Sequence, residues 1–238
     1  MLSLKDRIVL VTGAAGSLGR SVVKTFLAAE AGLVLVDRAP DRLPRLFPEL
    51  VDAPGHLLAT AVDVGDVEAV QAMVDRVVAR FGRIDVLVNT VGGYRAGTPV
   101  DSTPLEEWDL MFNLNARTAF IISRAVVPAM RAQAYGKIVH VASRAALKGS
   151  AKAAAYSASK SALVRLTESL SAELKRSGIN VNCVMPSTID TAANRQGMPK
   201  ADTSRWVTPE AIADAILFLA SDAARAIHGA SIPVYGTG

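Results

Sequence analysis

Tyr156 and Lys160 are four residues apart, and Ser143 lies thirteen residues before the tyrosine. Residues i and i+4 of a helix project from one face, with Cβ atoms about 5–6 Å apart. A cation at that distance lowers the pKa of a phenol, ordinarily near 10, by roughly 1–3 units. Such a phenol exchanges a proton with an alcohol or carbonyl oxygen near neutral pH, and the Ser143 hydroxyl would hold that oxygen. The same spacing also occurs on ordinary solvated helix faces.

A glycine-rich turn follows the first predicted strand. Residues 7–11 are apolar and rich in β-branched side chains, which is typical of a buried parallel strand, and residues 20–30 have a helical pattern. Between them, residues 12–19 read Thr-Gly-Ala-Ala-Gly-Ser-Leu-Gly. Such a turn lets the backbone approach a pyrophosphate, which the N–H groups and dipole of the helix N-terminus bind. The glycine spacing meets the general dinucleotide fingerprint only approximately.

Asp37 ends the second predicted strand, residues 33–36, and lies eighteen residues after Gly19. This is close to the offset at which an acidic residue accepts a hydrogen bond from an adenosine ribose 2′-hydroxyl. Alternatively, Asp37 is a loop residue that begins a turn. Together with the glycine turn, Asp37 favours a dinucleotide site, and its charge would repel the 2′-phosphate of NADP. We therefore expect NAD rather than NADP, with Arg38 as a group that could swing toward a phosphate.

Strand and helix patterns alternate along the rest of the chain. Further strands are predicted at residues 57–62, 84–89, 137–142, 179–184 and 232–234. Residues 67–81 carry one apolar helical face, and three prolines between residues 40 and 48 predict a short or broken helix. This alternation predicts an α/β fold: a Rossmann-type, doubly wound parallel sheet of about seven strands with helices on both faces, in a single domain of residues 1–238. Ligands bind such sheets at the carboxyl ends of the strands.

The motifs together resemble the short-chain dehydrogenase/reductase family over nearly the whole chain. The turn at residues 12–19 fits the family's Thr-Gly-x-x-x-Gly-x-Gly pattern, with Ser17 in place of the middle glycine. Residues 89–92 stand where the family usually has Asn-Asn-Ala-Gly, and residues 186–191 resemble its Pro-Gly-x-x-x-Thr segment beside the nicotinamide. Asp63 and Val64 resemble the pair that contacts adenine. The replacements at Thr90 and Val91 are expected to change packing more than chemistry.

The resemblance implies a catalytic set of Asn115, Ser143, Tyr156 and Lys160. In these roles Ser143 orients the substrate oxygen, Tyr156 is the general acid/base, Lys160 lowers its pKa and binds the nicotinamide ribose, and Asn115 maintains a proton relay. The residues expected to bind the cofactor are Gly13, Ser17, Leu18, Gly19, Asp37, Asp63, Val64, Asn89, Tyr156, Lys160, Pro186, Ile189 and Thr191.

The implied activity is hydride transfer between NAD(H) and a secondary alcohol or carbonyl compound. Two alternatives stay open: an NADPH-dependent 3-oxoacyl thioester reductase, and a non-catalytic nicotinamide-binding protein. The residues expected at the substrate are Ser143, Tyr156, Tyr94, Arg95, Arg144 and Ser187, with a lid over residues 192–205. Arg95 and Arg144 would pair with a substrate carboxylate or phosphate, or else point to solvent or tie down loops.

Composition excludes several other classes. The chain has 238 residues, is 50% apolar and carries a net charge of +4 with the signs interspersed, so no nucleic-acid footprint is expected. No signal peptide or membrane-spanning run is apparent, and the single cysteine, Cys183, suits a reducing compartment; we expect a cytoplasmic protein. Three scattered histidines predict no metal site, and His140 is expected in the core or behind the site. Pro233 predicts an edge strand, and a homotetramer is expected.

Overall fold

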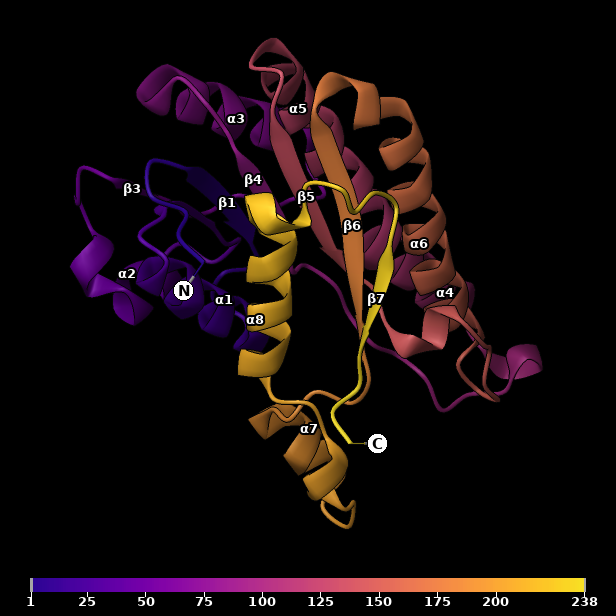
Figure 1. The fold of residues 1–238 in the computed structure, drawn as a ribbon. Coiled ribbons are helices and arrows are strands. Elements are labelled where there is room, and N and C mark those ends of the chain that lie inside the picture. The colour runs from indigo at the N-terminus through magenta and orange to yellow at the C-terminus, as the bar shows by residue number, and fades with distance from the viewer. Residues whose placement is uncertain (1, 238) are drawn as a thin grey trace.

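A parallel sheet of seven strands organises residues 2–237, the part of the chain that the computed structural model describes (Figure 1). The strands are β1 (Ile8–Thr12), β2 (Gly32–Val36), β3 (His56–Ala59), β4 (Val86–Asn89), β5 (Gly136–Val141), β6 (Ile179–Pro186) and β7 (Ser231–Val234). Their order is β3-β2-β1-β4-β5-β6-β7, and every neighbouring pair is parallel. The chain winds outward from β1 in both directions, so the order reverses between β1 and β4. The predicted fold class is confirmed.

Most strand boundaries differ from the predicted ones by one or two residues, and the larger differences have local causes. β3 ends at Ala59 rather than at residue 62, because Ala61 has a φ of 56° and leaves the extended region. The first helix ends at Ala28 rather than residue 30, because Glu30 has a φ of 63°. Pro233 does lie in an edge strand, since β7 is the last strand of the sheet.

Eight α-helices connect and cover the described strands. They are α1 (Ser17–Ala28), α2 (Arg42–Leu46), α3 (Val67–Phe81), α4 (Leu105–Phe112), α5 (Thr118–Ala132), α6 (Ala154–Leu174), α7 (Ala192–Gly197) and α8 (Pro209–Ala220). The proline-rich segment forms the short α2, as predicted. The α3 helix begins where the Asp66 carboxylate accepts two backbone N–H groups, and it ends at Gly82 in the left-handed conformation.

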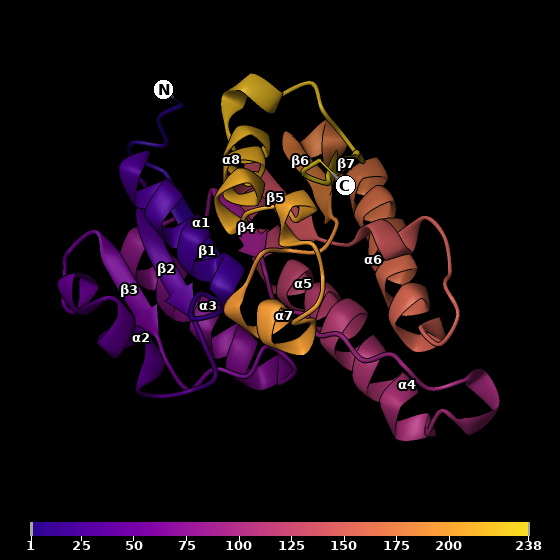
Figure 2. The same cartoon turned by 90° about the horizontal axis from the view of Figure 1, so that it is seen from below.

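The helices form a layer on each face of the sheet (Figures 1 and 2). One layer contains α1 and α8, and the other contains α3, α5 and α6. Successive strand residues serve opposite layers: Val86 and Val88 pack in the first, and Leu87 packs in the second. The central strands are therefore buried on both faces, which explains their continuous apolar sequences. Among residues 2–237, no helix has both the length and the apolar character that crossing a membrane requires.

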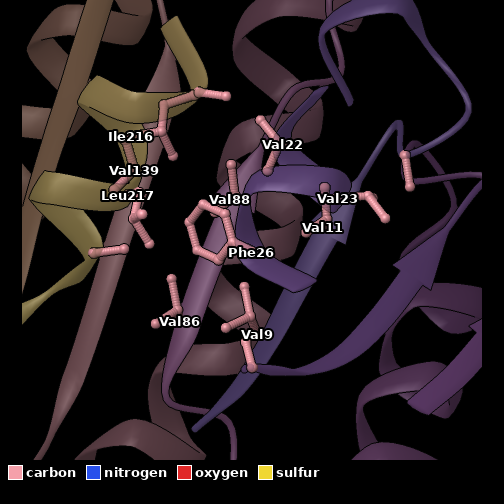
Figure 3. Close-up of a cluster of buried hydrophobic side chains, with 14 of the residues drawn as sticks. Val9, Val11, Val22, Val23, Phe26, Val86, Val88, Val139, Ile216 and Leu217 are labelled. Atoms are coloured by element: carbon pink, nitrogen blue, oxygen red, sulfur yellow. The ribbon is translucent and has the colours of Figure 1, made fainter. Parts of the chain in front are cut away.

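Phe26 of α1 is the largest side chain in the first layer and is fully buried (Figure 3). It lies among Val9 and Val88 of the sheet and Ile216 of α8, so it joins all three elements of this layer. The position of α1 matters for function, because its N-terminus follows the glycine turn.

We expect Phe26→Ala to lower the free energy of unfolding by about 3–5 kcal/mol, the usual cost of removing a buried phenylalanine. Urea denaturation at neutral pH measures this change. Phe218→Ala is the matched control: its side chain is 41% exposed on α8, so its loss should cost less. Equal losses for the two variants would contradict the packing described for α1.

Candidate active site

The polar residues singled out in the sequence gather at one edge of the sheet. Thr12 and Asn89 are the last residues of β1 and β4, and Pro186 is the last residue of β6. Ser143 follows β5 by two residues. Because all strands are parallel, these positions share the carboxyl edge, beyond which α7 projects (Figure 1). Figure 2 views the molecule from this side.

The glycine turn has the shape that a pyrophosphate needs. Gly13 has a φ of 66°, and a Cβ atom there would lie 2.9 Å from the Thr90 hydroxyl. A Cβ atom at Gly19 would overlap the Gly13 carbonyl oxygen, so both positions require glycine. Gly16 precedes α1 without a side-chain cap, and the first turn of α1 has no acidic residue. The N-terminal N–H groups of this helix therefore face an open turn that suits an anion.

Two threonines and an asparagine hold this turn against the sheet. The buried Thr12 hydroxyl donates to Asn89 Oδ1 at 2.6 Å, and the Thr90 hydroxyl donates to the Thr12 carbonyl at 2.7 Å. Thr90, which replaces the family's second asparagine, therefore links the ends of β1 and β4. This bond agrees with the expectation that the replacement changes packing rather than chemistry.

Asp37 lies directly after β2 and is buried. Its Oδ1 accepts the Ala39 N–H at 3.0 Å and lies 3.8 Å from the Arg42 guanidinium. Arg42 also donates to the Ala15 carbonyl at 3.1 Å, so it joins the glycine turn to the proposed ribose site. Arg38, the cation expected from the sequence to reach a phosphate at this site, is exposed, and the position of Arg42 beside Asp37 was not predicted. Arg42 could have been identified from its position at the start of the short helix that the prolines break, five residues after Asp37.

Ser143 follows β5, Tyr156 lies on α6, and the Ser143 side chain interacts with the Tyr156 phenol. Burial raises the pKa of Tyr156, the Ser143 hydrogen bond partly offsets this, and the Tyr94 phenol adds to the rise. The sequence-based expectation that Lys160 lowers this pKa is therefore not met in this geometry. The Lys160 ammonium instead donates to the Val141 carbonyl at 2.9 Å. Helical i, i+4 spacing places the two residues on one face but leaves the long lysine side chain free to choose its partner.

Lys160 and Asn115 converge on Gly92. A methyl group added at Gly92 would lie 2.9 Å from Asn115 Oδ1 and 3.1 Å from Lys160 Nζ. Burial lowers the pKa of Lys160 to about 8. Asn115 lies in a π-helical turn between α4 and α5, where its side chain accepts the Gly93 N–H and donates to the Ser159 hydroxyl. This turn breaks the regular helix at a predicted catalytic residue, a common position for π-turns.

Of the predicted substrate residues, Tyr94 packs against Tyr156, whereas Arg144 and Ser187 contact Tyr235. The Tyr94 ring stands edge-on to the Tyr156 ring, with centroids 4.8 Å apart. The Arg144 guanidinium lies 5.5 Å from the centroid of the Tyr235 ring. Ser187 donates to the Tyr235 carbonyl at 2.7 Å, so its hydroxyl ties β6 to the C-terminal segment. Tyr235 was not predicted, because nothing in the sequence brings the chain end back beside Ser143.

The predicted lid, residues 192–205, contains α7 and a short 3-10 turn at residues 203–205. Thr191 caps α7 by accepting the Asn194 N–H, and Asp190 forms two hydrogen bonds with Arg195. A β-bridge between Ile189 and Val207 closes the segment at its base. The segment is thus a structured excursion that starts and returns at the carboxyl edge.

The remaining predicted cofactor residues lie around the same edge. Ser17 and Leu18 begin α1, with Leu18 buried, and Val64 is buried after β3. The exposed Asp63 carboxylate accepts the Gly65 N–H at 2.7 Å. In the described part of the chain, no three His, Cys, Asp or Glu side chains are grouped closely enough to hold a metal ion.

His140 and Cys183 lie behind the site, as the sequence predicts. They are register partners on β5 and β6, and both are fully buried. His140 contacts the Ser123 hydroxyl at 3.4 Å, while its Nδ1 has no hydrogen-bond partner in the described structure. Burial, together with the smaller influence of the nearby Lys160 charge, lowers the pKa of His140 to about 4.

Comparison with known proteins agrees with this geometry. The family model described as short chain dehydrogenase matches residues 7–202. The BbsD subunit of (2S)-[(R)-hydroxy(phenyl)methyl]succinyl-CoA dehydrogenase from Thauera aromatica is 34% identical, over 99% of this chain and 97% of its own. NAD⁺-bound xylitol dehydrogenase has a TM-score of 0.88 at 28% identity, covering 98% of each chain. ElxO with NADP bound has a TM-score of 0.89 at 25% identity, covering 97% of each chain.

The chain therefore belongs to the short-chain dehydrogenase/reductase family and is an oxidoreductase. The two solved neighbours differ in their cofactor, NAD in one and NADP in the other, so the likeness supports a nicotinamide dinucleotide without choosing between them.

His140 should make the protein sensitive to acid. Its pKa in the folded state, about 4, lies below the unfolded value near 6.5, so the unfolded chain binds more protons between these values. Stability from this residue is complete above pH 6.5 and is lost as the pH falls toward 4. We expect His140→Asn to reduce the loss of unfolding free energy between pH 7 and pH 4.5 by roughly 2–3 kcal/mol. Urea denaturation at the two pH values tests this, and an unchanged loss in the variant would contradict it.

Proposed function

We propose that the protein is an NAD-dependent oxidoreductase that interconverts a secondary alcohol and a carbonyl compound, with Tyr156 as the general acid/base. The observation that carries the proposal is the grouping of four side chains at the carboxyl edge. Ser143 interacts with the Tyr156 phenol, Asn115 and Lys160 both approach Gly92, and Ser159 links Asn115 to the Tyr156 carbonyl. A protein that only binds a dinucleotide needs neither the serine nor the tyrosine. This argues against the non-catalytic alternative.

The protonation states suit proton transfer to a substrate oxygen. Burial keeps the Tyr156 phenol protonated at neutral pH, so it is ready to donate in the reductive direction. The Ser143 hydroxyl, which interacts with this phenol, would hold the substrate oxygen beside it. Lys160, with a pKa near 8, can take up and release a proton close to neutral pH. Asn115 keeps the backbone at Gly93 in place beneath Lys160, which supports its predicted part in the relay.

The cofactor would be held along the carboxyl edge. The α1 N-terminus and the turn from Gly13 to Gly19 would bind the pyrophosphate, Asp37 would accept from the adenosine ribose, and Asp63 and Val64 would flank the adenine. Lys160 would bind the second ribose, and residues 186–191 would flank the nicotinamide. When bound, NAD(H) supplies the hydride acceptor or donor.

The NADPH-dependent thioester reductase remains the second candidate. One observation favours its thioester part: a relative that this chain matches over nearly its full length is named for a CoA thioester. The buried Asp37 carboxylate argues against its NADPH part, although Arg42 beside it reduces the local negative charge.

We also propose that the chain is one catalytic domain, that residues 192–205 close over the substrate, and that the enzyme works in the cytoplasm as a homotetramer. Exposed apolar side chains on α4 and α5, including Leu105, Trp108 and Phe120, support self-association, as does the free edge at β7. Light scattering tests the assembly, and a stable monomer at micromolar concentration would contradict it.

Tyr156→Phe should lose turnover by on the order of 10²-fold or more while it still binds NADH, because the ring stays and only the hydroxyl that carries the transferable proton is removed. Turnover is measured against a panel of secondary alcohols and ketones, and NADH binding by fluorescence titration. Tyr135→Phe is the matched control, since the Tyr135 hydroxyl bonds Asp222 and takes no part in the site. Near-normal turnover by Tyr156→Phe on the preferred substrate would refute the mechanism.

Asp37 should set the preference for NAD. Two like charges about 4 Å apart at an effective dielectric constant near 20 repel by about 4 kcal/mol, so the carboxylate disfavours a 2′-phosphate. We expect Asp37→Ala to tighten NADPH binding and weaken NADH binding, because Arg42 then faces the phosphate without a competing carboxylate. Arg42→Ala should not tighten NADPH binding. Unmodified protein that binds NADPH as well as NADH would overturn the preference.

A further inference from the structure

Two loops are joined beside the catalytic pair. One follows β4 and comprises residues 93–99, and the other follows Ser143 and comprises residues 144–153. The Gly97 N–H donates to the Lys152 carbonyl at 2.8 Å, and Lys152 adopts a φ of 61° at this contact. The loops therefore lie side by side between α4 and the start of α6 (Figures 1 and 2). We refer to residues 93–99 and 144–153 as the rim.

The rim borders the way from Tyr156 to solvent. Its first loop places the Tyr94 ring against the Tyr156 ring. Its second loop begins at Ser143 and runs to α6, which carries Tyr156, and the Ser161 hydroxyl fixes it by donating to the Ala146 carbonyl at 2.8 Å. Any part of a substrate that extends outward from the Ser143–Tyr156 pair on this side passes the rim.

The charges on the rim have one sign. It contains Arg95, Arg144, Lys148 and Lys152 and no aspartate or glutamate, and the next acidic residue along the first loop is Asp101. Arg144 is engaged with the Tyr235 ring, so the argument rests on the other three, all of which are exposed. Cations gathered at the mouth of a site attract anionic ligands and raise the rate at which they arrive.

The rim cations lie within reach of a ligand that extends from Tyr156. Lys152 precedes Tyr156 by four residues, which limits the separation of their Cα atoms to roughly 14 Å, and a lysine side chain extends the reach further. The rim also exposes two largely apolar side chains: Tyr94 is 67% exposed and Leu147 is 62% exposed. The rim thus combines exposed apolar surface with positive charge.

We propose that the rim binds the phosphate groups of a substrate whose reacting alcohol or carbonyl stands at the end of a flexible arm, as in a thioester of a nucleotide-type carrier such as coenzyme A. Arg95, Lys148 and Lys152 bind the phosphates, and Tyr94 and Leu147 line the arm. This inference rests on the proposed function for the reaction at Ser143 and Tyr156, and adds the class of substrate.

Coenzyme A itself is the probe, because it carries the phosphates and the arm but no reacting carbonyl. Its binding is measured by titration calorimetry with NADH present at saturation, which blocks the dinucleotide site. We expect the unmodified protein to bind it and R95Q/K148Q/K152Q to bind it about tenfold or more weakly, as for the loss of charge-assisted contacts. Binding to the unmodified protein should also weaken as salt is raised.

The control variant K5Q/K175Q/R176Q removes the same number of lysines and arginines from the opposite edge of the sheet, before β1 and before β6. It should bind coenzyme A as the unmodified protein does. The inference is overturned if the unmodified protein fails to bind coenzyme A, if the rim variant binds it normally, or if the control loses as much. It is also overturned if the rim substitutions weaken the binding of an acidic carrier protein but not the binding of coenzyme A. Turnover of an uncharged secondary alcohol, measured separately, tests the proposed function, so the two can fail independently.

Discussion

Burial of the parallel sheet on both faces is the constraint on which the rest of the structure depends. Val86 and Val88 of β4 pack in one helix layer and Leu87 packs in the other, so the middle of this central strand must be apolar. Polar side chains that could react or bind a ligand therefore lie at the strand ends. Because the strands are parallel, all of their carboxyl ends lie at one edge of the sheet. The hydrogen bonds of Thr12, Asn89 and Thr90 then fix that edge where β1 meets β4, the point at which strand order reverses.

Desolvation is the main electrostatic influence on the site. It raises the pKa of Tyr156 and lowers the pKa values of Lys160 and His140, because in each case it disfavours the charged form. The Ser143 hydrogen bond acts in the opposite direction on Tyr156 but does not outweigh burial. The result is a neutral phenol and, one turn further along the same helix, a lysine that titrates near neutral pH, two groups suited to proton exchange.

Charges at the two edges of the sheet have different uses. At the amino edge they are paired: Asp85 bonds both Arg7 and Arg83, and Asp222 bonds Tyr135. These contacts join strands and stabilise the fold. At the carboxyl edge, all charged side chains of the rim are cations, beside the proposed path of the substrate. Arg42 lies beside Asp37 at the same edge, where a cofactor ribose is expected. Part of the net positive charge of the chain is therefore concentrated at this edge.

The sequence alone determined the fold class and the family, because these depend on local patterns: apolar strands, a glycine turn and helical spacing. The catalytic set that it predicts rests on the same patterns. It also predicted the broken α2 and the edge strand with Pro233. Only the tertiary structure decided which partner each long side chain takes. Lys160 bonds Val141 rather than the phenol, Arg42 rather than Arg38 lies beside Asp37, and Tyr235 returns to Arg144 from the chain end. Spacing along one helix cannot specify such contacts, because they join elements far apart in the chain and depend on how deeply packing buries each group.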